Sequence, residues 1–243
     1  MSKPAKTRLG FALALLLLAS AGKGGELFLT AEPQDPPFSM EIDGQPSGLA
    51  ATILRPALKR AGVPYEISVH PWMRAYDMAL KTPQTCVYAT TPTEQRRPLF
   101  KWIGPLFAES WVLFATADSP IHATTLDELR GLRIGGSQGA AQTIYLQTLG
   151  VPIDVLSAVD NMSDNLRKLL AGHIDLWATG LKRGSYTAKI MGAKIKPVLA
   201  LRQVELYLAC NRSTDDTVIT RVNAVLADMR ADGTIARLSL PYQ

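Results

Sequence analysis

Short apolar runs alternate with helix-like repeats along most of the 243-residue chain. Apolar and β-branched runs that end at turn-forming residues are typical of strands, whereas apolar positions at helical spacing are typical of helices. The pattern predicts strands at 26–31, 65–69, 85–88, 109–117, 155–159, 172–179, 197–201 and 205–211. It predicts helices at 49–61, 74–80, 126–129, 140–149, 163–171, 185–191 and 218–238.

The order of these elements indicates an α/β fold, because strands and helices alternate. Long extended segments interrupt the alternation twice, at 109–117 and near 201–211. Gly104-Pro105 is expected to break the apolar run that precedes the first of them. Two extended crossings favour a fold of two lobes.

The first 21 residues have the pattern of a secretory signal peptide. Lys3, Lys6 and Arg8 precede an apolar run at 11–18, and Ala-Ser-Ala at 19–21 fits an A-x-A cleavage site. The apolar run is shorter than the ~20 residues that span a bilayer, so a retained anchor is the less favoured alternative. We expect the mature protein in the periplasm.

The charge of the chain bears on nucleic acid as a partner, and its two cysteines bear on whether a disulfide forms. The chain has 26 basic and 21 acidic residues, and removal of the leader leaves 23 basic residues and a formal charge of +2. No block of Lys or Arg remains, so we expect no nucleic-acid partner. Cys86 and Cys210 both lie in apolar, strand-like runs. A periplasmic disulfide and two buried free thiols are equally favoured.

The loop after the strand at 85–88 holds Arg96, three residues after Thr93. A guanidinium is planar, always charged and able to bind both oxygens of a carboxylate. Arg96 is therefore a candidate carboxylate receptor. The alternative is a structural ion pair with Glu94, Glu109 or another acid.

A second candidate for anion binding lies in the glycine-rich stretch 131–139, which reads as a strand and a turn before the helix at 140–149. Backbone N–H groups at that helix start, from Gly139 to Gln142, suit an anion. An ordinary strand-to-helix turn is the alternative, and the phosphate-loop patterns are absent.

Catalytic and metal-binding patterns are lacking. His70, His122 and His173 show no metal-ligand spacing, and no G-x-S-x-G is present. We expect no enzymatic activity, no metal ion and no cofactor.

The segment Thr93, Arg96, Trp102 and Gly104-Pro105 resembles the signature of bacterial extracellular solute-binding proteins of family 3. Phe38 with the following turn, Leu-Leu-Ala-Gly-His-Ile-Asp at 169–175, and residues 229–234 match the family in the same order. The resemblance covers essentially the whole mature chain. It implies a two-lobed, type II periplasmic-binding-protein-like fold with a ligand cleft between the lobes.

The resemblance implies residues 22–113 plus 206–243 in the first lobe, 114–205 in the second, and hinges in the crossing segments. It further implies a monomer that captures a small carboxylate-bearing solute, an amino acid or related compound, and delivers it to a membrane ABC permease. The same fold also serves lyases similar to cyclohexadienyl dehydratase and ligand-sensing modules, which are the alternatives.

The ligand contacts that the resemblance implies come from both lobes. They are Phe38, Trp72, Ala89, Thr91, Arg96, Gly139, Ala140, Ala141, Asp160, Thr179 and Gly180. Arg96 would bind the carboxylate. For Phe38 and Trp72, packing of the core is an equally favoured role.

Two positions depart from the amino-acid receptors of this family. Gly180 replaces an acid that pairs with the ligand's ammonium, and Ala140 or Ala141 replaces a hydroxyl. An unpaired buried ammonium would cost several kcal/mol. We therefore expect another acid such as Asp160 in the cleft, a ligand without an amine, or a larger solute that lies on Trp72, Trp102 or Trp177.

Overall fold

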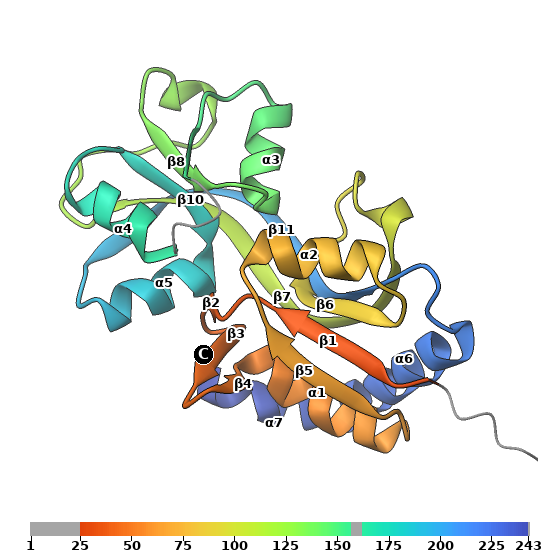
Figure 1. Ribbon diagram of the computed structural model, residues 1–243. Coiled ribbons are helices and arrows are strands. Elements are labelled where there is room, and N and C mark those ends of the chain that lie inside the picture. Colours follow the sequence, from red (N-terminus) through yellow and green to blue (C-terminus); the bar gives the residue numbers. More distant parts are fainter. Residues whose placement is uncertain (1–24, 157–161, 243) are drawn as a thin grey trace, which may run out of the picture.

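A long mixed sheet runs through both halves of the molecule in the computed structural model, which describes residues 25–156 and 162–242 (Figure 1). The sheet has eight strands in the order β5-β1-β6-β11-β7-β10-β8-β9. Helices cover its two ends and form two lobes, at the lower right and the upper left of Figure 1. The predicted α/β fold with two lobes is confirmed.

The first lobe is built on the parallel strands β1 (Leu27–Ala31), β5 (Tyr65–Val69) and β6 (Thr85–Thr90). Its helices are α1 (Leu49–Arg60), α2 (Trp72–Lys81), α6 (Asp216–Ala231) and α7 (Thr234–Ser239), with the short helices η1 (Arg97–Leu99) and η3 (Leu240–Tyr242). A small sheet of β2 (Gln34–Asp35), β3 (Ser39–Ile42) and β4 (Gln45–Ser47) packs beside α1.

The second lobe is built on β8 (Ile134–Ser137), β9 (Asp154–Leu156) and β10 (Leu176–Gly180), with β8 between the other two and parallel to both. Its helices are α3 (Ala141–Thr148), α4 (Met162–Leu170) and α5 (Leu181–Ile190), with the short helix η2 (Asp127–Leu129).

Two long antiparallel strands, β7 (Lys101–Thr116) and β11 (Ile195–Cys210), belong to both lobes. β11 pairs with β6 in the first lobe, and β7 pairs with β10 in the second. The lobe limits expected at 113 and 205 fall within these two strands, and as exact boundaries they remain a prediction.

The expected breaks in the crossing strands are wrong. β7 continues through Gly104-Pro105, and β11 is one strand where two were predicted. The pairing between β7 and β11 shifts register between Leu206 and Leu208. Pairing therefore resumes on the other side of Gly104-Pro105, and β7 does not end there. Gly104 has a φ of 143°, and a Cβ there would lie 2.7 Å from the Tyr207 ring. Glycine is required at that point.

Several smaller predictions also differ from the structure. α5 begins at Leu181, four residues before the predicted start at 185, and β10 begins at Leu176, where 172 was predicted. Gly172 has a φ of 70° and donates its N–H to the Leu169 carbonyl, so it still belongs to the end of α4. The predicted helical region 218–238 is divided at Gly233, whose φ is 74°.

Each lobe has its own core on both faces of the sheet, and alternate strand residues enter opposite faces. In the first lobe, Cys86 and Tyr88 of β6 face α1, α6 and α7, whereas Val87 faces α2. In the second lobe, Phe114 of β7 packs on α4 and α5, and its neighbour Leu113 lies with α3. The lobes are therefore joined mainly through β7 and β11.

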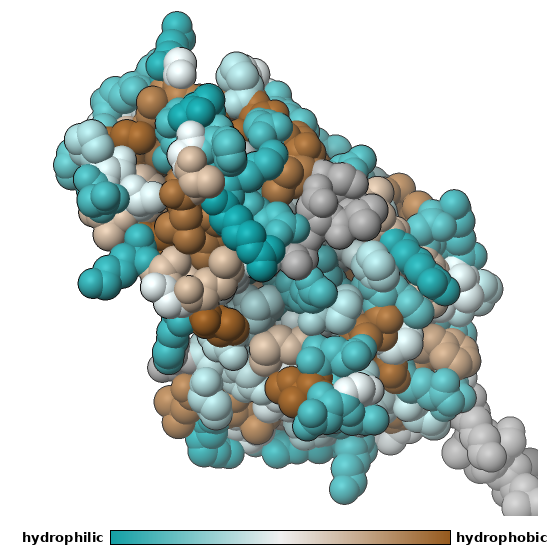
Figure 2. All heavy atoms as spheres, turned by 60° about the vertical axis from the view of Figure 1, so that its left-hand side comes forward, coloured by the Kyte–Doolittle hydropathy of each residue, from teal (hydrophilic) through white to brown (hydrophobic). Residues whose placement is uncertain are grey.

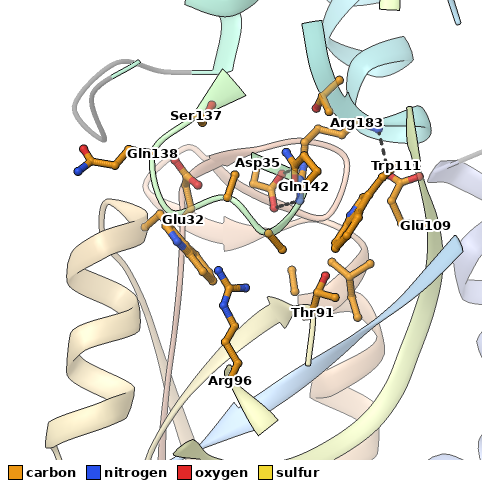
Figure 3. A pocket seen from close by; sticks show the side chains of 16 residues that line it. Glu32, Asp35, Thr91, Arg96, Glu109, Trp111, Ser137, Gln138, Gln142 and Arg183 are labelled. Atoms are coloured by element: carbon orange, nitrogen blue, oxygen red, sulfur yellow. Dashed lines mark hydrogen bonds and ion pairs between the residues drawn. The ribbon is translucent and has the colours of Figure 1, made fainter. Parts of the chain in front are cut away.

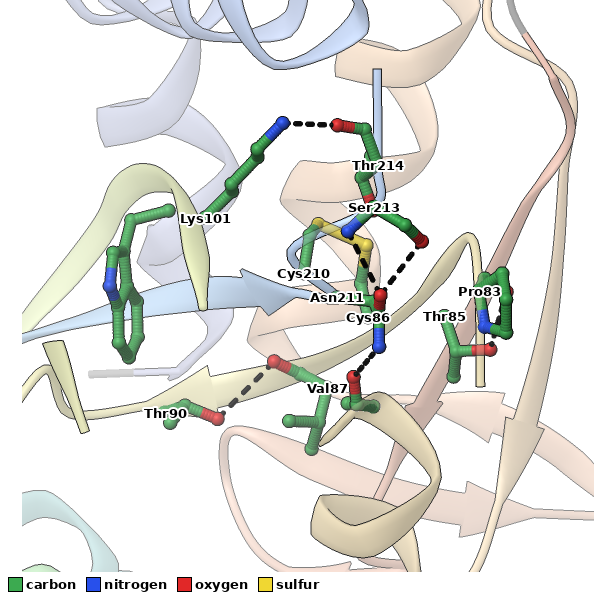
Figure 4. The surroundings of a disulfide bond; sticks show 12 residues. Pro83, Thr85, Cys86, Val87, Thr90, Lys101, Cys210, Asn211, Ser213 and Thr214 are labelled. Atoms are coloured by element: carbon green, nitrogen blue, oxygen red, sulfur yellow. Dashed lines mark hydrogen bonds between the residues drawn. A yellow bond between two sulfur atoms is a disulfide. The ribbon is translucent and has the colours of Figure 1, made fainter. Parts of the chain in front are cut away.

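A disulfide joins Cys86 of β6 to Cys210 of β11, which lie opposite each other in the ladder (Figure 4). Both residues are fully buried. Beside the bond, the Asn211 side chain donates to the carbonyls of Ala79 and Leu80 at the end of α2. Of the two alternatives for the cysteines, the structure has the disulfide, and it lies entirely within the first lobe.

Exposed large apolar side chains occur in both lobes. Figure 2 shows one mostly hydrophilic face. The most exposed large apolar residues are Ile190, Leu240 and Ile42. Exposed apolar residues of this scattered kind are ordinary on soluble surfaces. None of the helices within the described ranges has the length and apolarity that a bilayer crossing requires.

Replacement of both cysteines, as in Cys86→Ala with Cys210→Ala, should lower the free energy of unfolding by about 2–4 kcal/mol, because the disulfide restricts the unfolded chain. Urea denaturation measures this. Dithiothreitol should lower the midpoint of the wild type and leave the double variant unchanged. Equal midpoints for the fully reduced and the oxidised wild type would contradict the expectation.

Candidate functional site

A cavity of about 70 Å³ lies between the two lobes, next to the crossing strands (Figure 3). Both lobes contribute side chains to it. The residues that line it are Glu32, Asp35, Trp72, Ala89, Thr91, Arg96, Glu109, Trp111, Ser137, Gln138, Ala140, Ala141, Gln142, Thr179, Arg183 and Leu206. The cavity therefore joins strand ends and helix starts from distant parts of the chain.

Arg96 reaches the cavity from the loop that follows β6. The loop is held by the Arg96 N–H, which donates to the Thr93 carbonyl at 3.0 Å and to the Thr93 hydroxyl at 3.3 Å. The guanidinium carbon lies 5.3 Å from the centre of the Trp72 ring and 5.4 Å from that of Tyr76. Aromatic faces at this distance stabilise a cation.

The Arg96 guanidinium has no carboxylate partner among the described residues. Its Nη2 donates to the Gly139 carbonyl of the second lobe at 2.7 Å. The residue is only 6% exposed, and this burial lowers the pKa of Arg96, although arginine stays charged in proteins. The predicted alternative, an ion pair with Glu94 or Glu109, is not formed.

The turn after β8 faces Arg96 across the cavity. Gly139 has a φ of 71°, and Ala140, the residue before α3, provides no side-chain cap. The first N–H groups of a helix have no partner within it, so they are available to a ligand. Beside them, the Ser137 hydroxyl accepts a hydrogen bond from the buried Asn165 side chain at 3.1 Å.

Glu109 places a carboxylate beside Gly180. A Cβ on Gly180 would lie 2.5 Å from Glu109 Oε2, so the carboxylate fills the space that a side chain at this position would take. Glu109 accepts from the N–H groups of Ser110, Lys182 and Arg183 at 2.8, 3.2 and 3.4 Å. It thus caps the start of α5 from the crossing strand. Burial raises the pKa of Glu109, although Arg183 and these N–H groups oppose the shift.

Asp35 and Arg183 form a buried ion pair across the cavity. Arg183 Nη2 donates to Asp35 Oδ2 at 2.7 Å, and Arg183 Nε contacts the other carboxylate oxygen. The side chains are 13% exposed for Arg183 and 9% for Asp35. The charge of Arg183 is therefore matched within the protein, unlike that of Arg96.

Glu32 is the third acid of the cavity, and its carboxylate forms no hydrogen bond or ion pair with another described residue. Burial, together with the charge of Asp35, raises the pKa of Glu32 to about 7, and Arg183 opposes this shift. Glu32 therefore binds and releases a proton near neutral pH. The cavity holds two guanidinium groups and three carboxyl groups.

Seven of the residues expected at the site line the cavity. They are Trp72, Ala89, Thr91, Arg96, Ala140, Ala141 and Thr179. Gly139 and Gly180 lie just behind it, where Gly139 contacts Arg96 and Gly180 contacts Glu109. Asp160 lies outside the described residues.

Three aromatic residues that were considered for the cleft lie outside the cavity lining, and for Phe38 the structure has the packing role, the second of its two alternatives. Phe38 is fully buried in the first core and stacks on Phe107 at 4.6 Å, so it does not line the cavity. Trp177 is 1% exposed and packs against Phe114, and Trp102 packs against Phe100 and Tyr207. Trp111 of β7 lines the cavity instead.

Several lining residues could not be found from local pattern. They are Glu32, Asp35, Glu109, Trp111, Ser137, Gln138, Arg183 and Leu206. Some lining residues were nevertheless near an expected feature. Ser137 and Gln138 lie in the glycine-rich stretch 131–139, Gln142 at the start of the helix at 140–149, and Glu109 and Trp111 in the strand expected at 109–117. One local pattern could have indicated Glu32 and Asp35 as site residues. Both lie next to prolines, which restrict the backbone of that loop.

Metal binding has no support in the geometry. Within the described part of the chain, His, Cys, Asp and Glu side chains form no group that could hold a metal ion. His122 and His173 are exposed, and His70 lies at the end of β5 outside the cavity lining.

Comparison with known proteins places the chain in one family. The model of the bacterial extracellular solute-binding proteins, family 3, matches residues 27–243. No curated protein sequence matches the chain.

Solved structures share the fold at low sequence identity. A histidine kinase sensor domain with similarity to periplasmic binding proteins is 19% identical, with 90% of this chain and 96% of that chain covered and a TM-score of 0.82. The arginine-, lysine-, histidine-binding protein ArtJ from Geobacillus stearothermophilus is 17% identical, with 90% and 95% covered and a TM-score of 0.77. An arginine 3rd transport system periplasmic binding protein from Legionella pneumophila is 19% identical, with 90% and 99% covered and a TM-score of 0.74.

Glu32→Gln should stabilise the protein above neutral pH. A carboxyl group whose pKa is raised from 4.5 to about 7 by folding binds more protons in the folded than in the unfolded state, so its contribution to stability falls as pH rises through that window. We expect the variant to be more stable than the wild type by about 1–2 kcal/mol at pH 8 and nearly equal to it at pH 4.5.

Urea denaturation at the two pH values measures the difference. Glu41→Gln changes an exposed carboxylate of β3 and is the matched control, which should not alter the pH dependence. If the difference in the free energy of unfolding between Glu32→Gln and the wild type is the same at pH 4.5 and pH 8, the raised pKa of Glu32 is contradicted.

Proposed function

Because this chain belongs to the bacterial extracellular solute-binding proteins, family 3, we propose that it is a periplasmic receptor that captures a small carboxylate-bearing solute between its lobes and delivers it to an ABC importer. The observation that carries the proposal is the buried Arg96 guanidinium, which lines the cavity without a carboxylate partner among the described residues. A buried charge without a counter-charge is costly, so an anionic ligand stabilises it.

The geometry around Arg96 suits a carboxylate. Arg96 would bind it from the first lobe through charge-assisted hydrogen bonds, and the uncapped N–H groups at the start of α3 would bind it from the second. A bound carboxylate would compete with the Gly139 carbonyl for the guanidinium. The same ligand would then contact both lobes at once.

The acids of the cavity support a ligand that also carries an amine. Glu109 fills the space beside Gly180, and Glu32 has no partner within the described residues. An ammonium group would compensate both carboxylates. In this proposal, the Glu109 carboxylate takes the role of the acid that is missing at position 180. A free amino acid is therefore the first ligand to test. The neighbours described as arginine-, lysine- and histidine-binding make these three the first compounds in such a screen.

The proposed mechanism is closure of the lobes about β7 and β11, which alone run through both of them. The ligand shifts the population because it contacts both lobes only in the closed state. A micromolar affinity corresponds to about −8 kcal/mol, which a bound carboxylate, several N–H groups and an ammonium contact can supply. We propose no catalytic role for the site.

A ligand-sensing role is the second candidate, and the histidine kinase sensor domain with a TM-score of 0.82 favours it. The two roles differ in the partner of the closed form. Photo-crosslinking in cells followed by mass spectrometry separates them: a permease subunit as the partner supports import, and a histidine kinase supports sensing.

Arg96→Ala should strongly weaken ligand binding. Loss of one partner of a buried, hydrogen-bonded charge pair costs about 2–5 kcal/mol, so we expect at least a 30-fold weaker affinity by calorimetry for any amino acid found in a thermal-shift screen. Arg97→Ala is the control, because Arg97 is adjacent and exposed outside the cavity lining. Equal affinity for the wild type and Arg96→Ala would refute the carboxylate receptor.

Glu109→Gln should reduce the preference for an amine. We expect the affinity ratio between an amino acid and the matching acid without the amine to fall by about 10-fold, since a hydrogen bond to a charged group contributes about 1.5–3 kcal/mol. Calorimetry with both compounds gives the ratio. If both affinities fall equally, Glu109 acts only as the cap of α5.

A further inference from the structure

The Asp35–Arg183 pair connects the two lobes. Asp35 is in β2 of the first lobe, and Arg183 is in the first turn of α5 in the second lobe. Figure 3 shows the Arg183 side chain extending across the cavity to the Asp35 carboxylate. Both Nε and Nη2 contact the carboxylate, which is a two-pronged geometry specific to arginine.

Arg183 has further contacts on both sides of the cavity. The Arg183 guanidinium carbon lies 5.3 Å from the centre of the Phe38 ring, and Phe38 stacks on Phe107 in the first core. On the other side, the backbone N–H of Arg183 donates to Glu109, which fixes the start of α5 on the crossing strand. Arg183 therefore spans from the second lobe to a rigid receptor in the first.

The Asp35–Arg183 contact can form without a ligand, because the two charges neutralise each other. Removal of one partner of such a pair leaves a buried charge, which costs about 3–5 kcal/mol in a rigid protein. In this protein, separation of the lobes would expose the remaining charge to water, and solvation would then lower that cost. Loss of either side chain should therefore favour an open cleft.

We propose that Asp35 and Arg183 form an interlobe latch that stabilises the closed cleft before a ligand binds. The second polar contact across the cavity, from Arg96 to the Gly139 carbonyl, involves one charge and one neutral group. It can be exchanged for a bound anion, whereas the latch is already neutral. The latch thus sets the fraction of closed protein before any solute binds, and it does not depend on the identity of the solute.

Small-angle X-ray scattering of the ligand-free protein tests the latch. Co-purified solute is removed by unfolding in urea, dialysis and refolding with the disulfide intact. The ligand-free wild type should have a larger closed fraction than the latch variants, so Asp35→Asn and Arg183→Met should each raise the radius of gyration. The double variant removes both charges of the pair, and Glu109 keeps its three backbone N–H donors. It should therefore fold even if a single variant does not, and it should also be more expanded than the wild type.

The control is Arg133→Met with Asp175→Asn. This pair has the same two-pronged geometry, with a shortest contact of 2.7 Å, but it lies wholly within the second lobe. It should leave the scattering curve unchanged. A wild type that is already expanded, latch variants as compact as the wild type, or an equal expansion in the control would each overturn the proposal. Because no ligand is present, the outcome is separate from that of the Arg96→Ala binding test.

Discussion

The antiparallel pairing of β7 with β11 is the interaction on which the remaining structure depends. The two strands pair from Lys101 to Thr116, and each also pairs with a strand of a different lobe. The two lobes have separate cores, so this ladder is their main connection. Glu109, Trp111 and Leu206 lie where the ladder passes between the lobes, and all three therefore line the cavity.

The buried charges that line the cleft differ in how they are compensated. Asp35 and Arg183 neutralise each other, and Glu109 is held by backbone N–H groups at the start of α5. Arg96 contacts two aromatic rings, the Tyr76 hydroxyl and the Gly139 carbonyl, and it has no carboxylate partner among the described residues. Buried charges normally require a partner, so the guanidinium without a carboxylate partner is the observation behind the proposed ligand role.

Much of the fold could be predicted because most of its elements are encoded locally. The strand at 65–69 agrees with β5, the helix at 49–61 agrees closely with α1, and Gly62 follows with a φ of 61°. The predictions failed where pairing overrides the local pattern. Gly104-Pro105 does not end β7, because β11 supplies the partner that carries the strand past it.

The sequence by itself determined the alternation of strands and helices, the two extended crossings and Arg96 as a candidate anion receptor, since each depends on residues close together in the chain. Only the tertiary structure decided that Cys86 meets Cys210, that Glu109 fills the space beside Gly180, and that Asp35 meets Arg183. These contacts join segments between 71 and 148 residues apart, as the residue numbers show. Such meetings depend on strand register and on the placement of one lobe against the other, and neither is recorded in the local spacing of apolar and polar residues.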